Sequence, residues 1–290
     1  MLVMNDEIRT KLDAENRKMM EGLTIPDNIV RYVNLKYGTQ DKRQNLDVYR
    51  PKNAQGERLP VLINVHGGGW IFGDKDLYQF YAMSLAQQGF AVVNINYRLA
   101  PEFKFPAQLE DINRVCSWVL EHQEDYLLDT DHIFMVGDSA GANLTAQYAC
   151  ILTNPKFAKN FPFQKPAGFS LLSVGLNMGM YDPAKDKIDS ITESFLPLYL
   201  ANEEEQRPLI GSCAYVTPEF PIAFLMDSYG DFVRAQSALM QAALEKNEVQ
   251  YALRMFPAKQ KHVFHIHIQD RIARICNLEE CGFFKSLMAQ

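Results

Sequence analysis

The segment 137–141 has the sequence Gly-Asp-Ser-Ala-Gly, which is the pattern G-x-S-x-G, and it directly follows an apolar run at 133–136. In this pattern a sharp turn between a strand and a helix raises the serine hydroxyl above the edge of a sheet. We expect Gly137 and Gly141 to come so close in this turn that a Cβ atom would clash. Ser139 would lie at a helix N-terminus, where unpaired N–H groups favour developing negative charge. The pattern predicts that Ser139 is a nucleophile; the alternative is a glycine-rich turn that the serine caps.

The segment 66–70, His-Gly-Gly-Gly-Trp, directly follows a second apolar run at 61–65. Three consecutive glycines lose much backbone entropy on folding, so the loop needs unusual torsions or a close approach of its backbone to another group. Free N–H groups that stabilise a reacting atom would explain it, although on its own the segment also fits a flexible turn. Beside a nucleophile elbow, a loop of this type is typical of one wall of the oxyanion hole in lipases and esterases.

A serine hydroxyl is a weak nucleophile and needs a general base, usually a histidine that a carboxylate orients. The chain has six histidines, and three of them, His262, His265 and His267, follow the last apolar run. Because α/β-hydrolases carry these residues in the order Ser, Asp or Glu, His, the base is expected in this cluster. His262 comes first after the loop 257–261 and is our predicted base. His265 and His267 are expected to be packing or surface residues, and either is the alternative base.

The carboxylate that orients this base is expected in the turn after the apolar run at 222–226. Asp227 and Asp231 both qualify. Asp227 lies on or next to the expected strand, whereas Asp231 lies further into the loop, from which its carboxylate can reach back to His262. We predict that Asp231 is the acid and keep Asp227 as the alternative, since an aspartate that opens a helix is also a common N-cap.

Short apolar runs alternate with helical stretches from residue 60 to the end of the chain. Such runs suit strands that are buried on both faces of a parallel sheet. The alternation predicts a doubly wound and mostly parallel α/β sheet of about eight strands in a single domain, 1–290, with ligands at the carboxyl ends of the strands. The expected strands are 29–37, 44–49, 61–65, 91–95, 133–136, 169–172, 222–226 and 251–255, and the expected helices are 76–88, 106–124, 140–153, 231–246 and 269–288.

The interval 175–221 breaks this alternation and interleaves large apolar residues with polar ones. Connections longer than about 15 residues are usually functional insertions. We predict that the interval forms a small helical cap over the carboxyl edge of the sheet, joined by the N-terminal segment 1–28. The alternative is an extra helix that packs on the side of the sheet.

Charge and cysteine content argue against several classes of protein. Lys and Arg total 29 against 35 Asp and Glu, a net charge of −6 with no basic run, which argues against nucleic-acid binding. No stretch of about 20 residues is apolar enough to span a bilayer, and Asp6 and Glu7 precede any apolar run, which is not typical of a secretory signal. The five cysteines have no CxxC spacing and predict free thiols rather than disulfides or a metal site, so we expect a cytoplasmic protein.

Taken together, these motifs resemble the hormone-sensitive-lipase-like family of α/β-hydrolase carboxylesterases over about residues 60–265. The elbow and the glycine loop match the GDSAG and HGGG motifs of the family. Between them lies a third match, which is chiefly structural in the family: Asn-Tyr-Arg-Leu-Ala-Pro-Glu at 96–102, Phe-Pro-Ala at 105–107, and Asp111.

The expected acid and base also lie in segments that resemble the family. Residues 231–234 resemble its D-P-L-x-D turn and residues 262–264 its H-x-F turn. The departures leave every reactive group in place and concern backbone detail: Phe232 stands where Pro is usual, Val263 where Gly is more usual, and Ala142 where many members carry Gly.

The resemblance implies that the N–H groups of Gly68, Gly69 and Ala140 form the oxyanion hole. It also implies an α/β-hydrolase fold, a cap over an acyl pocket, and no metal or organic cofactor. We expect the substrate to contact Trp70, Asp138, Phe195 and Tyr199, and the large residues of the cap, Met178, Met180, Tyr181, Phe195 and Tyr199, to form the pocket wall.

The sequence therefore predicts a serine carboxylesterase that hydrolyses short-chain acyl esters, from acetyl to hexanoyl, of a small molecule. A cap of this size can cover a pocket but hardly form a long hydrophobic tunnel. A deacetylase of acetylated sugars or xylan would use identical residues and is the alternative. A peptidase or amidase, which often adds a recognition domain, and a non-catalytic ligand-binding protein on the same fold are less favoured. We expect no membrane or nucleic-acid partner, and the sequence leaves a homodimer open.

Overall fold

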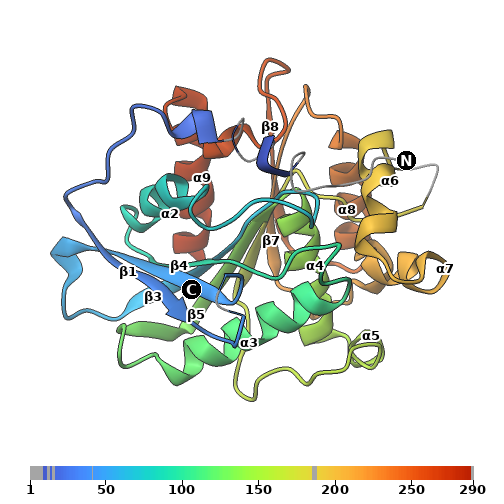
Figure 1. The fold of residues 1–290 in the computed structure, drawn as a ribbon, viewed down its shortest axis with the longest axis horizontal. Helices are drawn as coiled ribbons and strands as arrows, with labels where there is room; N and C mark the ends of the chain where they lie inside the picture. The colour runs from blue at the N-terminus through green and yellow to red at the C-terminus, as the bar shows by residue number, and fades with distance from the viewer. Residues whose placement is uncertain (1–8, 12–13, 15–16, 41, 185–187, 289–290) are drawn as a thin grey trace.

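The computed structural model describes residues 9–11, 14, 17–40, 42–184 and 188–288. Its centre is a sheet of eight strands in the order β1-β2-β4-β3-β5-β6-β7-β8 (Figure 1). The pairs β1–β2 and β2–β4 are antiparallel, and all other neighbours are parallel. The predicted doubly wound, mostly parallel sheet is confirmed. The strands are β1 Ile29–Lys36, β2 Asn45–Pro51, β3 Leu59–Val65, β4 Ala91–Ile95, β5 Leu128–Asp138, β6 Ser173–Asn177, β7 Ile222–Ser228 and β8 Tyr251–Phe256.

Helices cover both faces of the sheet (Figure 1). On β3, Val61, Ile63 and Val65 belong to the core cluster under α3, α4 and α8, whereas Leu62 belongs to the cluster under α2 and α9. This alternation follows from the two-residue period of a strand. None of the helices described combines the length and the apolar character that a membrane crossing requires. The helices are α2 Gln79–Ala86, α3 Ala107–Glu121, α4 Ala140–Thr153, α5 Pro155–Ala158, α6 Ser190–Tyr199, α7 Glu203–Gln206, α8 Arg234–Lys246 and α9 Arg271–Leu287, with 3₁₀ helices η1 Lys18–Met20, η2 Lys52–Ala54, η3 Arg207–Ile210, η4 Cys213–Tyr215 and η5 Phe264–Ile266.

One expected strand, 169–172, is wrong. These residues are irregular and bury Phe169 and Leu171 in the core, and the strand that pairs with β5 and β7 is β6, which begins at Ser173. The sequence of β6 is only weakly apolar. It lies in the sheet because Gly175 leaves room for a side chain of α9: a Cβ on Gly175 would lie 2.4 Å from Oε1 of Glu280. Tertiary packing therefore overrides the local strand preference here.

The chain between β6 and β7 contains α6, α7, η3 and η4. Asp189 caps α6, because its carboxylate accepts the N–H groups of Ile191 and Thr192. Phe195 of α6 lies against the glycine loop, since a Cβ on Gly69 would lie 2.7 Å from its ring. This contact, at the carboxyl end of β3, supports the cap prediction for 175–221 over a helix on the side of the sheet. Of the N-terminal segment, residues 1–8, 12–13 and 15–16 lie outside the described residues.

A buried ion pair fixes the segment between the two glycine motifs. The carboxylate of Asp111 on α3 is fully buried and accepts hydrogen bonds from Nε of Arg98 at 2.9 and 3.0 Å. It also accepts the backbone N–H of Arg98 at 2.8 Å and the side-chain amide of Gln44 at 2.6 Å. These contacts agree with the structural role that the family resemblance implies for this segment.

We predict that Asp111→Ala lowers the free energy of unfolding by about 3–5 kcal/mol, because it leaves a partly buried guanidinium without its main partner. Glu110→Ala is the matched control: Glu110 binds the same Arg98 but is partly exposed, so a loss below about 1 kcal/mol is expected. Urea unfolding measures both. Equal losses would show that the burial of Asp111 has no special role.

Candidate active site

Ser139 forms the turn between β5 and α4 and has φ 52° and ψ −118°. Positive φ is rare for residues other than glycine. The turn is tight, because a Cβ on Gly137 would lie 2.4 Å from the backbone of Gly141. A Cβ on Gly141 would lie 2.0 Å from the carbonyl oxygen of Val65, the last residue of β3. The expected close approach of the two glycines is confirmed, and it packs the start of α4 against the end of β3.

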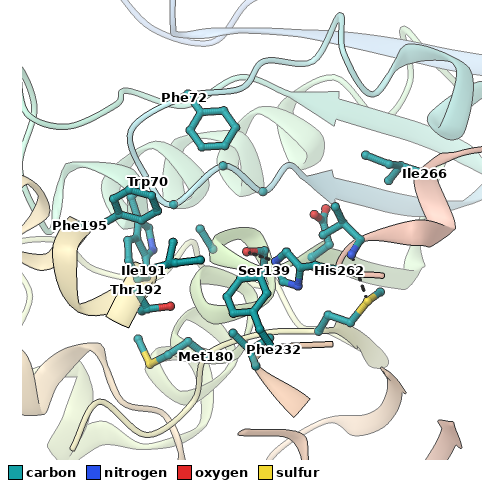
Figure 2. Close-up of a pocket in the computed structure, with 18 of the residues that line it drawn as sticks. Trp70, Phe72, Ser139, Met180, Ile191, Thr192, Phe195, Phe232, His262 and Ile266 are labelled. Atoms are coloured by element: carbon teal, nitrogen blue, oxygen red, sulfur yellow. Dashed lines mark hydrogen bonds between the residues drawn. The ribbon is translucent and has the colours of Figure 1, made fainter. Parts of the chain in front are cut away.

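The side chains of Ser139, His262 and Asp231 form a continuous series of hydrogen bonds. Figure 2 shows Ser139 beside the imidazole of His262. Nε2 of His262 lies 2.9 Å from Oγ of Ser139. Nδ1 of His262 lies 2.8 Å from Oδ2 and 3.0 Å from Oδ1 of Asp231. Because an ionised carboxylate can only accept, the hydrogen bond to Asp231 selects the tautomer of the neutral imidazole with the proton on Nδ1, in which Nε2 accepts the serine hydroxyl.

Asp227, the alternative acid, has other partners. Its carboxylate accepts the backbone N–H of Ser228 at 2.6 Å and the hydroxyl of Ser237. Burial raises the pKa of Asp227 to about 6, and the neighbouring Asp231 adds to this shift. Asp231 instead bonds His262 and accepts the N–H of Val233 at 2.8 Å. The structure therefore brings Asp231, and not Asp227, into hydrogen-bond contact with the imidazole.

The other histidines of the cluster lie elsewhere. His265 in η5 is buried with its ring edge-on to Tyr81, and burial lowers its pKa to about 3. His267 is exposed. Val263, which stands where the family more often has glycine, has φ 52° and follows His262 directly. Its N–H donates to Sδ of Met178 at 3.2 Å, a contact that holds the turn carrying the imidazole.

The glycine loop lies beside Ser139 with two residues in the left-handed half of backbone space, Gly68 at φ 118° and Gly69 at φ 57°. A Cβ on Gly68 would lie 2.2 Å from the carbonyl oxygen of Phe72. The carbonyl of Gly68 accepts the N–H groups of Ile71 and Phe72, both at 3.0 Å. Within the described part of the chain, the N–H groups of Gly68 and Gly69 have no acceptor, so they are available to a bound oxygen.

A cavity of about 380 Å³ opens over Ser139 (Figure 2). Of the four residues predicted to contact substrate, Trp70, Asp138 and Phe195 line this cavity. Tyr199 does not; it lies behind Trp70, with the two rings stacked at 4.5 Å. Of the predicted wall, Met178, Met180 and Phe195 line the cavity, whereas Tyr181 lines a separate one.

Several lining residues were missed from the sequence, chiefly Phe72, Leu77, Tyr78, Ile191, Phe232 and Ile266. Phe232 is 47% exposed, and the centre of its ring lies 4.5 Å from that of His262. Because Phe232 directly follows Asp231, the expected acid, the sequence could have predicted that it lies near the cavity. Ile266 and Leu77 carry no such signal, because they reach the cavity through the packing of η5 and α2. In the described ranges, no group of three His, Cys, Asp or Glu is arranged to hold a metal ion.

Comparison with known proteins decides the family. A model of the BD-FAE family matches residues 46–244, more than half of the chain, including both glycine motifs and Asp231. The chain belongs to the BD-FAE family. The resemblance to hormone-sensitive-lipase-like carboxylesterases of the α/β-hydrolase superfamily is thereby confirmed.

Relatives of this BD-FAE chain include esterase LipQ of Mycobacterium tuberculosis, which is 35% identical over 150 residues, 51% of this chain and 35% of LipQ. The match thus spans about a third of that relative. An acetyl esterase of Salmonella schwarzengrund is 25% identical over 244 residues, 79% of this chain and 72% of the relative. Among solved structures, an inhibited esterase B from Lactobacillus rhamnosis superposes with a TM-score of 0.90 at 25% identity, covering 97% of this chain and 94% of that one.

Beneath the elbow of this BD-FAE protein lies a buried carboxyl group that the sequence did not indicate. Glu280 of α9 is fully buried, and its Oε1 accepts the side-chain amide of Asn177 at 3.0 Å. The carbonyl of Asn177 in turn accepts the N–H of Ser139 at 2.9 Å. Burial raises the pKa of Glu280 to about 7, and the charge of Asp138 adds to this shift.

The raised pKa of Glu280 predicts how stability depends on pH. The folded state binds this proton more tightly than the unfolded state does, so the contribution is full below about pH 4.5 and is lost as the pH rises through about 7. Glu280→Gln stays neutral. Its free energy of unfolding relative to the wild type should therefore rise by about 2–3 kcal/mol between pH 5 and pH 8.

Urea unfolding at the two pH values measures this difference. Glu279→Gln, one residue earlier on α9 and partly exposed beside Arg254, is the matched control and should show no such pH dependence. A Glu280→Gln difference that is the same at both pH values would contradict the prediction.

Proposed function

We propose that this protein is a serine carboxylesterase that acts through an acyl-enzyme. The observation that carries the proposal is the contact of 2.9 Å between Nε2 of His262 and Oγ of Ser139, with Asp231 bonded to the opposite nitrogen. Ser139 and His262 line an apolar cavity, in a fold shared with esterases, and Asp231 lies on the other side of the imidazole. A complete set of this kind favours an enzyme over a non-catalytic ligand-binding protein.

In the first half of the reaction, His262 removes the proton of Ser139 as Oγ attacks the ester carbonyl. Asp231 holds the imidazole in the required tautomer and stabilises the imidazolium that forms. The N–H groups of Gly68, Gly69 and Ala140 stabilise the tetrahedral oxyanion. In related chemistry the loss of one such donor costs about 3–4 kcal/mol.

The first half ends when the tetrahedral intermediate collapses: the C–O bond to the alcohol breaks, the imidazolium of His262 gives its proton to the leaving alcohol, and an acyl group remains on Ser139. In the second half, water attacks the acyl-enzyme, with His262 as the base once more. The same three amides stabilise the second oxyanion. The carboxylic acid leaves, and the proton returns to the hydroxyl of Ser139.

The lining of the cavity supports uncharged esters as substrates. No lysine or arginine occurs among the described residues that line it, and apolar side chains from several segments, among them Trp70, Phe195 and Phe232, dominate. Burial of an unpaired carboxylate in such a site would be costly. The lining also favours a general esterase over a sugar deacetylase, which would need more hydrogen-bonding side chains for the sugar hydroxyls. Trp70 and Phe195 are the proposed apolar contacts of the substrate.

We predict that Ser139→Ala and His262→Ala each lower kcat for p-nitrophenyl acetate by about 10⁴-fold or more, because the nucleophile and base act as a unit. His265→Ala and His267→Ala should change kcat little, since neither ring contacts Ser139. Stopped assays at matched protein concentration measure these rates. Retention of more than about 1% of the activity by Ser139→Ala would reject it as the nucleophile.

The acid is tested by a matched pair of isosteric variants. Asp231→Asn should cost far more activity than Asp227→Asn, because only Asp231 bonds the imidazole in the described structure. The reverse order would show that the acid is assigned to the wrong residue.

We further predict a preference for acyl chains from about C2 to C6. Each added CH₂ gains about 0.8 kcal/mol only where it finds apolar wall, and a cavity of about 380 Å³ is filled by a short chain and its alcohol. Phe195→Ala should move the optimum of kcat/KM to longer p-nitrophenyl esters, because it removes a ring from the wall at α6 and so enlarges the cavity. Tyr199→Phe, behind Trp70, is the control and should leave the optimum in place. A wild-type maximum at C10 or longer would contradict the proposal.

A further inference from the structure

Tyr78, at the start of α2, connects the glycine loop to the nucleophile elbow through one hydroxyl group. The hydroxyl accepts the backbone N–H of Gly67 at 3.0 Å. It donates to Oδ2 of Asp138, the residue before Ser139, at 2.7 Å. No motif of the sequence includes Tyr78, and neither the nucleophile, the base nor the acid contacts it in these hydrogen bonds.

The connection is built into a buried, closely packed site. Tyr78 is 3% exposed and Asp138 is 1% exposed. A Cβ on Gly67 would lie 2.5 Å from Oδ2 of Asp138 and 3.0 Å from the hydroxyl of Tyr78. Gly67 is therefore required to be glycine by this contact, because its backbone lies directly on the two side chains.

The ionisation of both groups is consistent with a lasting hydrogen bond. Burial and the nearby Asp138 raise the pKa of Tyr78 well above its usual value, so the hydroxyl keeps its proton. Burial raises the pKa of Asp138 to about 7, and the bond from Tyr78 opposes that shift. An oxygen of the Asp138 carboxyl can accept this bond whether or not the other oxygen is protonated.

A second side-chain hydrogen bond joins the loop to α4, but it lies at the far end of the three glycines: Nε1 of Trp70 donates to Oδ1 of Asn143 at 3.2 Å. The Gly68 carbonyl is bonded within the loop, and the carbonyl of His66 accepts the hydroxyl of Tyr97 at 2.8 Å. Three consecutive glycines have wide conformational freedom. An oxyanion hole needs its donors within a few tenths of an ångström of their working places. The Tyr78 hydroxyl supplies a fixed point between the loop and the elbow.

We propose that Tyr78 is a positioning residue of the oxyanion hole, which through Gly67 and Asp138 holds the amides of Gly68 and Gly69 in register with that of Ala140. This inference rests on the proposed esterase function. Tyr78 acts through the loop backbone and does not touch the reacting atoms. The ring of Tyr78 lines the cavity, whereas its hydroxyl bonds only Gly67 and Asp138, so loss of the hydroxyl alone should weaken stabilisation of the transition state more than binding of the substrate.

The first test is Tyr78→Phe, which removes the hydroxyl and keeps the ring. We expect kcat for p-nitrophenyl butyrate to fall about 10- to 100-fold, less than the loss of a donor itself, with KM changed less than about 3-fold. Hydrogen–deuterium exchange of peptides that cover 66–70 should become at least about 10-fold faster. Tyr81→Phe, one turn later on α2 and also buried, is the matched control and should change neither reading.

The second test asks whether Tyr78 and Asp138 act as a unit. Asp138→Asn keeps an acceptor oxygen and should stay within about 5-fold of the wild-type kcat, whereas Asp138→Ala should match Tyr78→Phe. The double variant Tyr78→Phe/Asp138→Ala should be no slower than either single variant. Multiplicative losses, or an Asn variant as slow as the Ala variant, would overturn the shared role.

The exchange measurement separates this inference from the proposed function. If the wild type hydrolysed no ester, the esterase proposal would fail, while faster exchange in Tyr78→Phe would still support the anchoring of the loop. If the wild type is active and Tyr78→Phe leaves both kcat and the exchange of 66–70 unchanged, the positioning role is wrong.

Discussion

The backbone of Ser139 is the constraint on which the rest of the site depends. A residue other than glycine at φ 52° and ψ −118° costs about 1–3 kcal/mol, and such a conformation persists only where the surroundings enforce it. Here the enforcement is contact between elements: Gly137 lies against Gly141, and Gly141 lies against the end of β3. Because the glycine loop leaves β3 at this point, the same packing that strains the serine also places the proposed oxyanion donors beside it.

The register of the parallel sheet brings distant residues to this point. Asp138 pairs with Asn177 on β6, and Asn177 pairs with Met226 on β7. These partners lie at or near the carboxyl ends of their strands, so the loop after β7 delivers Asp231 and the loop after β8 delivers His262 to the same edge. More than a hundred residues of chain separate Ser139 from His262. The two side chains nevertheless meet, because both follow strands of one parallel sheet, whose carboxyl ends lie at the same edge. Residues that are distant in the sequence are thus brought together at one edge of the sheet.

The parts of the site that could be predicted are those with local patterns. The elbow follows from glycine sterics, and Asp231 and His262 follow from chain order and from the turns that carry them. The expected strand 169–172 was wrong because apolar content was read as strand, whereas β6 is held by packing around Gly175 and Glu280. Tyr199 is an aromatic residue of the same helix as Phe195, and the sequence does not distinguish the two. In the structure Phe195 faces the cavity, whereas Tyr199 stacks behind Trp70. Tyr78 and Ile266 approach the cavity only through the docking of α2 and η5, which no local pattern encodes.

The central claim, that Ser139 is an activated nucleophile beside free amide donors, is tested most directly by covalent trapping. A small alkyl fluorophosphonate reacts readily with an activated serine: Oγ bonds the phosphorus, fluoride leaves, and the tetrahedral adduct resembles the intermediate of ester hydrolysis. Intact-protein mass spectrometry should show one equivalent per chain, and peptide mapping should place it on Ser139, with the rate of labelling strongly reduced in His262→Ala. Labelling of another residue, or no adduct on the folded wild-type protein, would contradict the account.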